Sequence, residues 1–197
     1  MQEKAKVSLS AFELQLVTDE TFILTKNSII QKVYSLFGNL SDEYNSYLQQ
    51  MPGAPSPKIS KGENYKGLPY VMLDHPRLFS NEDVLAIRSL FWWGKYFSCT
   101  LQLKGIYRER YEQNIIHALQ QESFKDFFVS DGVDEWNHDV QHGYTNVKNI
   151  TTSSITSLPL IKLVAVHPLH EWETAEHFFR ESVQRYAQLM QDQLPRR

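Results

Sequence analysis

Residues 84–104 read VLAIRSLFWWGKYFSCTLQLK, with Gly94-Lys95 between two runs of β-forming residues. Valine, isoleucine, phenylalanine, tryptophan and threonine favour the pleated surface of a strand. Glycine tolerates a positive φ at the first central position of a type II′ turn, so Gly94-Lys95 predicts a two-residue hairpin loop. An antiparallel hairpin is therefore expected at the centre of the fold.

The predicted turn also determines which side chains share a face, because side chains alternate along a strand. The expected core face carries Trp92, Leu90, Arg88 and Ala86 with Phe97, Cys99, Leu101 and Leu103. The expected opposite face carries Trp93, Phe91, Ser89 and Ile87 with Tyr96, Ser98, Thr100 and Gln102. This register directs Arg88 toward the core and leaves Trp93 and Tyr96 outside it.

The segments around the hairpin predict further strands and helices. Strands are expected at residues 68–73, 124–129 and 160–167, and helices at residues 106–121 and 171–190. The last helix has the clearest pattern, because its apolar residues recur at helical spacing along one side.

Three helices are expected before the strand-forming region of the chain. Ser10, Asn27 and Ser41 are the residue types that cap helix N-termini. Gly38 is expected to end the second helix, since glycine readily adopts the left-handed conformation that terminates helices. The third helix is expected to end before Pro52, because proline disfavours helical geometry in the preceding residue.

This order of elements predicts an α+β fold. We expect a mainly antiparallel sheet of about four to six strands, with N-terminal helices, one middle helix and a long C-terminal helix packed on it. The length of 197 residues favours a single domain over residues 1–197. Within it we expect a helical N-terminal region (residues 1–51), a loop (52–67), a sheet-rich region (68–170) and a C-terminal helix (171–190).

The composition of the chain limits which classes of partner and which cellular locations are expected. The chain has 20 Lys+Arg and 23 Asp+Glu, hence a net charge of −3, which disfavours a nucleic-acid partner. No stretch approaches the ~18 consecutive apolar residues of a membrane span, so no membrane partner is expected. The start of the chain lacks a signal-peptide pattern, and Cys99 is the single cysteine. A soluble, cytoplasmic protein is therefore predicted.

The aromatic cluster around the turn is one candidate binding surface. Trp93 and Tyr96, with Arg88 and Arg77 nearby, would offer apolar anchors beside charged groups to a small molecule or a protein partner. The alternative is that a helix covers this face and buries the aromatic rings as a second core layer.

Arg88 raises a separate question, because an isolated charge is very costly to bury. If the guanidinium points inward, it must be paired and hydrogen-bonded. We expect it to meet a carboxylate, such as that of Asp74 or Asp83, or an anionic ligand. The third alternative is that the predicted register is incorrect.

Four histidines form a second candidate site. His138 and His142 are four residues apart, and His167 and His170 lie where a strand is expected to meet the final helix. Imidazoles with nearby carboxylates could bind zinc or another transition metal. The alternative is that they are solvated loop residues and helix-entry residues, and no cofactor is otherwise predicted.

Three segments in the middle of the chain resemble a family of uncharacterised bacterial proteins. They are residues 62–70 (GENYKGLPY), residues 74–77 (DHPR) and residues 88–94 (RSLFWWG). The resemblance covers about the middle quarter of the chain. It implies a bacterial, cytoplasmic setting and brings no activity or catalytic residue with it.

These observations support three functional hypotheses. The leading one is a non-catalytic binding or interaction module that uses the aromatic hairpin. The first alternative is a metal-dependent hydrolase that uses the four histidines. The second is a structural homo-oligomer in which the hairpin or the last helix supplies the interface. Whether the protein is an enzyme stays open at this point.

Overall fold

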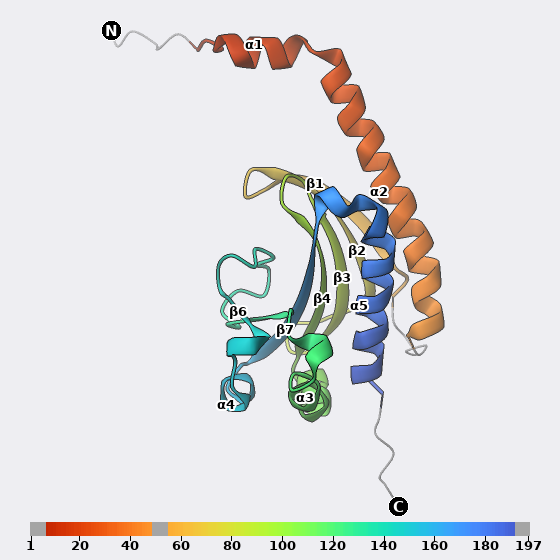
Figure 1. Ribbon diagram of the computed structural model, residues 1–197, viewed down its shortest axis with the longest axis vertical. Helices are drawn as coiled ribbons and strands as arrows, with labels where there is room; N and C mark the ends of the chain where they lie inside the picture. Colours follow the sequence, from red (N-terminus) through yellow and green to blue (C-terminus); the bar gives the residue numbers. More distant parts are fainter. Residues whose placement is uncertain (1–6, 49–54, 192–197) are drawn as a thin grey trace, which may run out of the picture.

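The computed structural model describes residues 7–48 and 55–191. It confirms the predicted α+β fold: one antiparallel sheet of seven strands, in the order β1-β2-β3-β4-β7-β5-β6, is combined with helices (Figure 1). The strands are β1 (Lys58–Tyr65), β2 (Leu68–Phe79), β3 (Val84–Trp92), β4 (Tyr96–Lys104), β5 (Phe128–Ser130), β6 (Tyr144–Asn146) and β7 (Leu160–Pro168).

The helices gather mainly on one side of the sheet. They are α1 (Ala11–Thr18), α2 (Glu20–Tyr47), α3 (Ile106–Ala118), α4 (Thr152–Thr156) and α5 (Ala175–Leu189), with 3₁₀ turns η1 (Glu122–Phe124), η2 (Val147–Asn149) and η3 (Leu169–Thr174). Figure 1 shows α2 and α5 side by side against one face of the sheet, while the loop that follows β5 lies on the other side. We call the side of the sheet that α2 and α5 cover the helix face, and we call the opposite side the polar face.

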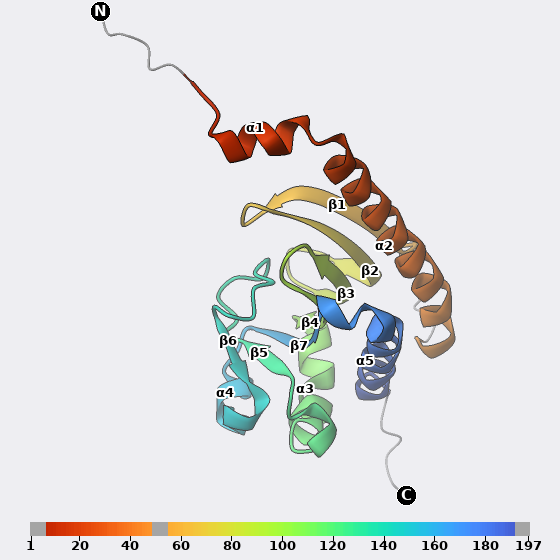
Figure 2. The same cartoon turned by 45° about the horizontal axis from the view of Figure 1, so that its top comes forward.

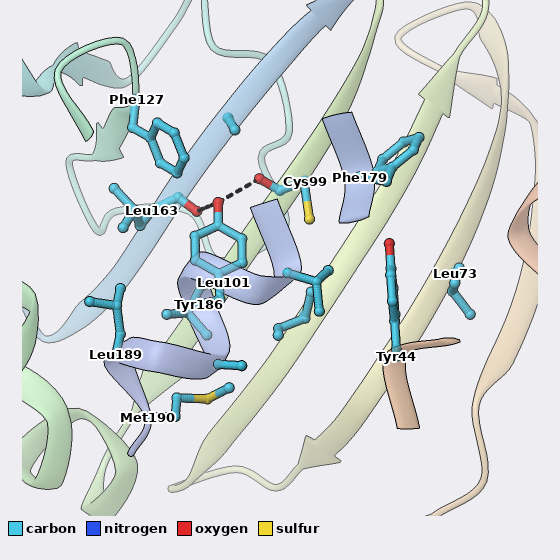
Figure 3. Packing of buried hydrophobic residues seen from close by; sticks show 14 of the residues in the cluster. Tyr44, Leu73, Cys99, Leu101, Phe127, Leu163, Phe179, Tyr186, Leu189 and Met190 are labelled. Carbon is cyan, nitrogen blue, oxygen red and sulfur yellow. Dashed lines mark hydrogen bonds between the residues drawn. The ribbon is translucent and has the colours of Figure 1, made fainter. Parts of the chain in front are cut away.

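The main hydrophobic core lies on the helix face. Figure 3 shows Tyr186 of α5 in this core, with its hydroxyl 2.8 Å from the carbonyl oxygen of Cys99 and 2.9 Å from that of Leu163. Phe37 of α2 meets Phe179 of α5 edge-to-face, with ring centroids 5.3 Å apart. The two long helices are therefore packed against each other and against the central strands.

The N-terminal helices differ from the predicted pattern. The helix start at Ser10 is confirmed, with Ser10 and Glu13 forming a capping box. Gly38 does not end a helix, because α2 continues through it to Tyr47. The buried stripe Ile30, Val33, Phe37, Leu40 and Tyr44 spans the glycine and outweighs its helix penalty of about 1 kcal/mol. The helix end predicted before Pro52 lies outside the described residues.

The predicted loop 52–67 was wrong at residues 58–65. Residues 58–65 form β1, which pairs antiparallel with β2. Its polar sequence has little strand propensity, so the neighbouring strand decides its conformation. The connecting residues Lys66 and Gly67 have φ values of 50° and 82°, as a two-residue hairpin turn of type I′ requires.

The central hairpin has a register that differs by one residue from the prediction. Both strands form where expected, but Trp92 pairs with Tyr96 across a three-residue loop, Trp93-Gly94-Lys95. A one-residue change exchanges the two faces of the partner strand. The polar face therefore carries Trp92, Leu90, Arg88 and Ala86 with Tyr96, Ser98, Thr100 and Gln102, and the helix face carries Phe91, Ser89 and Ile87 with Phe97, Cys99 and Leu101.

Gly94 has a φ of 70°, and a Cβ atom added to it would meet nothing within 4 Å. We expect Gly94→Ala to lower the free energy of unfolding by about 1–2 kcal/mol, because an L-residue is strained in this conformation. Gly38→Ala is the matched control: it lies within α2 and also has open space, so it is expected to stabilise the protein by about 1 kcal/mol. Urea unfolding measures both values, and two changes of the same sign would contradict this account of the turn.

Across residues 7–48 and 55–191, none of the helices combines the length and the apolar character needed to span a lipid bilayer.

Candidate functional site

The polar face of the sheet is buried although much of it is polar. Its buried polar residues include Asp74, Arg88, Ser98, Thr100, Gln102 and Lys162. Residues 131–143, the loop between β5 and β6, lie over this face and add buried His138 and Asp139. We call this segment the covering loop. Buried polar groups normally need hydrogen-bond partners, and Arg88 and Lys162 find partners in the loop.

Tyrosine hydroxyls on the sheet hold the backbone of the covering loop. Tyr65 of β1 accepts a hydrogen bond from the backbone N–H of His138 at 2.8 Å. Tyr96 of β4 accepts one from the N–H of Val140 and donates one to the carbonyl of His138, both at 2.9 Å. Burial raises the pKa of both hydroxyls, so they stay protonated at neutral pH. The loop is thus tied to two strands that are distant from it in sequence.

Lys162 of β7 also binds the backbone of the covering loop. Its side chain is fully buried, and its Nζ donates to the carbonyl oxygens of Glu135, at 3.1 Å, and of Asn137. Burial, with a smaller contribution from the positive charge of Arg88, lowers the pKa of Lys162 to about 7. An amine donates hydrogen bonds in either protonation state, so these contacts do not require the charge.

Arg88 lies at the centre of the site and contacts two titratable residues. Its Nε donates to Oδ1 of Asp74 at 2.7 Å, which is one of the two pairings expected from the sequence. Its Nη1 lies 3.4 Å from Nε2 of His138. The guanidinium carbon also lies 5.3 Å from the ring centroid of Trp136 and 5.4 Å from that of Phe79. These contacts hold the planar group in one orientation.

His138 is neutral in this environment. Burial is the main cause that lowers its pKa well below the ordinary value, and the charges of Lys162 and Arg88 add to the effect. Because a guanidinium can only donate, Nε2 of His138 accepts the hydrogen bond from Arg88. At neutral pH this nitrogen is therefore an acceptor that is already occupied.

A pocket of about 300 Å³ opens beside Arg88 and His138. Its walls come from β1, β2, β3 and the covering loop, and they are mostly aromatic or apolar: Tyr65, Tyr70, Met72, Leu90 and Trp136, with Ser60 at the edge strand. Trp136 remains 54% exposed, so the loop side of the pocket is accessible from solvent. The pocket combines apolar walls with one cationic group.

Further polar atoms on the same face lack protein partners. Among the described residues, no hydrogen-bond partner exists for Nε1 of Trp92, Oγ of Ser98 or either amide atom of Gln102. Leaving a buried polar group unsatisfied costs about 1–3 kcal/mol. Ordered water or polar groups of a ligand can satisfy such atoms.

The residues of the predicted aromatic surface do not come together. Arg88 lines the pocket, and Tyr96 shares its face but binds the covering loop. Trp93 lies on the helix face, half-buried against Phe91 with ring centroids 5.8 Å apart. Arg77 follows the irregularity in β2 and donates from Nε to the carbonyl of Ser56. The shared surface of Trp93 and Tyr96 was wrong, because the hairpin loop is one residue longer than predicted.

The four histidines of the predicted metal site are also separated. His138 is buried on the polar face, whereas His167 stacks on Phe178 on the helix face, with ring centroids 5.0 Å apart. His142 pairs with Asp139, and His170 is exposed. Within the segments that the structure describes, no group of three or more His, Cys, Asp or Glu residues is placed to hold a metal ion.

Several residues of the site were missed in the sequence, among them Tyr65, Trp136 and Lys162. Tyr65 and Trp136 have no local pattern that separates them from ordinary surface aromatics. Lys162 does carry a signal, because it is a lone charge within the apolar strand LIKLVAV, residues 160–166. A parallel or central strand of this kind is buried on both faces, so its lysine must find partners inside the protein.

Comparison with known proteins gives no relative from which a function could be inferred. The site is therefore characterised by its own chemistry: a buried guanidinium, a neutral imidazole and aromatic walls around a small pocket. No protein-family model, no curated protein and no solved structure matches the chain.

Proposed function

We propose that the protein is a binding module that takes up a small carboxylate-bearing molecule in the pocket beside Arg88. The observation that carries the proposal is a buried arginine side chain at the wall of an otherwise apolar and aromatic pocket. This modifies the leading hypothesis from the sequence: Arg88 is kept, and the aromatic partners become Tyr65, Tyr70 and Trp136.

The donors of Arg88 define the polar end of the ligand. Asp74 accepts from Nε and His138 from Nη1, and among the described residues Nη2 has no acceptor. Arginine donates hydrogen bonds and never accepts them, so a group placed beside Nη2 must be an acceptor. Carboxylates match the planar donor geometry of arginine particularly well. A carboxylate is therefore the favoured polar group.

The walls of the pocket define the rest of the ligand. Tyr65, Tyr70 and Trp136 offer ring faces and edges, and Met72 and Leu90 offer aliphatic surface. Such walls favour a planar or apolar body over a polyhydroxylated one. A volume of about 300 Å³ lies at the lower end of ligand-binding pockets, so the molecule is small.

The chemistry favours binding over acid–base catalysis at this pocket. His138 is the residue type most often used for proton transfer. Its low pKa keeps it neutral, and its Nε2 is occupied by Arg88. The metal-dependent alternative has no comparable support, because the four histidines lie in separate places.

Benzoate is a suitable first probe, because it combines a planar ring with one carboxylate. In a ¹H–¹⁵N spectrum of the full chain, the indole signals of the four tryptophans can be followed during titration. We expect benzoate to shift the Trp136 signal and to leave that of Trp172 unchanged, since Trp172 packs on Phe97 at the helix face. Neutral benzyl alcohol is expected to cause a much smaller shift. Equal shifts of all four signals, or none, would overturn the proposal.

Filling the pocket provides the matched variant test. Ser60→Phe places a ring in the pocket from the edge strand β1 and is expected to raise the Kd for benzoate about tenfold or more. Lys61→Phe is the control, because the neighbouring side chain points to the opposite face of the strand. Calorimetric titration measures both affinities. Equal Kd values in the two variants would place the benzoate site elsewhere.

A further inference from the structure

Residues 7–24 carry a second feature that the pocket does not explain. We call this segment the N-terminal arm; it comprises α1 and the first turn of α2, and Figures 1 and 2 show α1 extending away from the sheet and the other helices. None of the residues of α1 is buried. Eight large apolar side chains of the arm are exposed, at the following fractions: Val7 97%, Leu9 56%, Phe12 67%, Leu14 54%, Val17 69%, Phe22 45%, Ile23 49% and Leu24 57%.

The apolar residues of α1 surround the helix instead of forming one stripe. Phe12, Leu14, Leu16 and Val17 point in different directions, because successive residues are rotated by about 100° around a helix of 3.6 residues per turn. A helix on the surface of a globular protein normally keeps a polar face toward water. An exposed helix with apolar side chains in several directions normally packs against a partner, so α1 requires a covering partner.

Side-chain caps fix the helices of the arm. Ser10 and Glu13 cap the start of α1 reciprocally, with hydrogen bonds of 2.7 and 3.2 Å. Asp19 accepts a hydrogen bond from the N–H of Phe22 at 3.1 Å and so starts α2 at the bend between the helices. Each such cap stabilises a helix by about 1 kcal/mol. The caps therefore set the bend and the direction in which the apolar side chains are presented.

The exposed apolar area matches that of one partner in a stable dimer. Aromatic side chains cover about 150–250 Å² each and aliphatic ones somewhat less. At these exposed fractions the arm presents roughly 800 Å², the share of one partner in a standard interface of about 1,600 Å². Patches on monomeric proteins rarely exceed about 300–600 Å².

The charges of the arm argue against a lipid surface. Residues 7–24 contain Glu13, Asp19 and Glu20 and contain neither lysine nor arginine. Helices that lie on membranes usually combine an apolar face with a basic polar face. The arm carries no positive charge of its own.

We propose that the N-terminal arms of two copies of this chain pack against each other and form a homodimer. A two-fold axis lets the same apolar surface serve both copies, since each arm is then the partner of an identical arm. The bend at Asp19 lets α1 of one copy contact both α1 and the first turn of α2 of the other. This interface is separate from the hairpin and from the last helix, the two surfaces considered from the sequence.

Sedimentation velocity of the full chain tests the proposal. We expect the wild-type protein to sediment as a dimer of the 23.1 kDa chain at micromolar concentrations. Phe12→Glu/Val17→Glu is expected to weaken dimerisation at least tenfold, because the charges must be desolvated in the interface. Gln15→Glu/Thr18→Glu adds the same charge to α1 without removing apolar side chains and is expected to dissociate far less.

Two further measurements separate a loss of dimerisation from a loss of folding, and a second copy of the chain from a lipid surface as the partner. Both double variants are expected to unfold at the wild-type urea concentration when measured as monomers, because α1 buries nothing against the rest of the protein. A monomeric wild-type protein, or equal dimerisation of the two variants, would overturn the proposal. So would flotation of a monomeric wild-type protein with phosphatidylcholine vesicles, which would identify a lipid surface as the partner instead.

Discussion

Replacement of Arg88 by methionine is expected to lower the free energy of unfolding by about 3–5 kcal/mol. The side chains of Arg88 and Asp74 are 9% and 10% exposed, and they form an ion pair of 2.7 Å. Methionine fills much of the same volume but leaves the carboxylate of Asp74 buried without its cation. Equilibrium unfolding in urea at pH 7.5 measures the loss.

The double variant Asp74→Leu/Arg88→Met separates the cost of an unpaired charge from the contribution of the pair. Replacing both members of a buried pair by apolar residues is often neutral or stabilising. We therefore expect the double variant to recover most of the stability lost in Arg88→Met. If it is at least as unstable as the single variant, other contacts of Arg88, such as those with His138 and Trp136, dominate its role.

The stability of the protein is expected to rise with pH between pH 7 and 8.5, by up to about 1.4 kcal/mol per pH unit. The pKa of Lys162 is about 7 in the folded protein, against an ordinary value near 10.5. Between these values the unfolded chain binds a proton that the folded chain has released. Stability increases with pH wherever the unfolded state binds more protons, so the sign is positive.

Other titratable groups limit the pH range in which Lys162 alone determines how stability changes with pH. Burial raises the pKa of Cys99 to about 12, so above about pH 8.5 the unfolded thiol releases a proton that the folded thiol keeps. This effect opposes that of Lys162, and the stability is expected to level off. On the acidic side, the lowered pKa of His138 acts in the same direction as that of Lys162. Below about pH 6.5 the unfolded imidazole takes up a proton that the folded one does not, and stability falls further.

Lys162→Met is the variant that assigns the effect. It is expected to remove the rise in stability between pH 7 and 8.5, because the buried amine is no longer present. Lys104→Met is the control: it removes a partly exposed lysine that pairs with Glu135 of the same loop and leaves Lys162 in place. Urea unfolding at several pH values measures the slopes. Retention of the rise in Lys162→Met would show that another group causes it.

The predictable elements of the fold are those that local patterns specify. The strands at residues 84–92 and 96–104, the strand at residues 160–168 and the final helix have strong apolar periodicity, and all are observed near their predicted positions. The strand at residues 58–65 was missed because its sequence is polar. Its conformation depends on hydrogen bonds from β2, which no local pattern reveals.

The hairpin register illustrates a choice that the turn sequence leaves open. Gly94 suits a two-residue loop and a three-residue loop alike, because both accept a glycine with positive φ. In the folded protein the N–H of Trp93 donates to the carbonyl of Pro69 on β2, outside the hairpin. This contact with a third strand accompanies the longer loop, which places Tyr96 on the polar face, where it binds the covering loop.

The sequence by itself determined the class of fold and the positions of the two hairpin strands, and it named Asp74 as one of two carboxylates expected to pair with Arg88. These predictions follow from the pattern of apolar residues and from the cost of burying a charge. The predicted core face was wrong, because the structure places Arg88 on the polar face, opposite the main hydrophobic core. Only the tertiary structure decided that Tyr65, His138 and Lys162 meet around that arginine. Their partners lie 25 to 73 residues away along the chain, and contacts at such separations depend on how strands and loops pack rather than on local sequence.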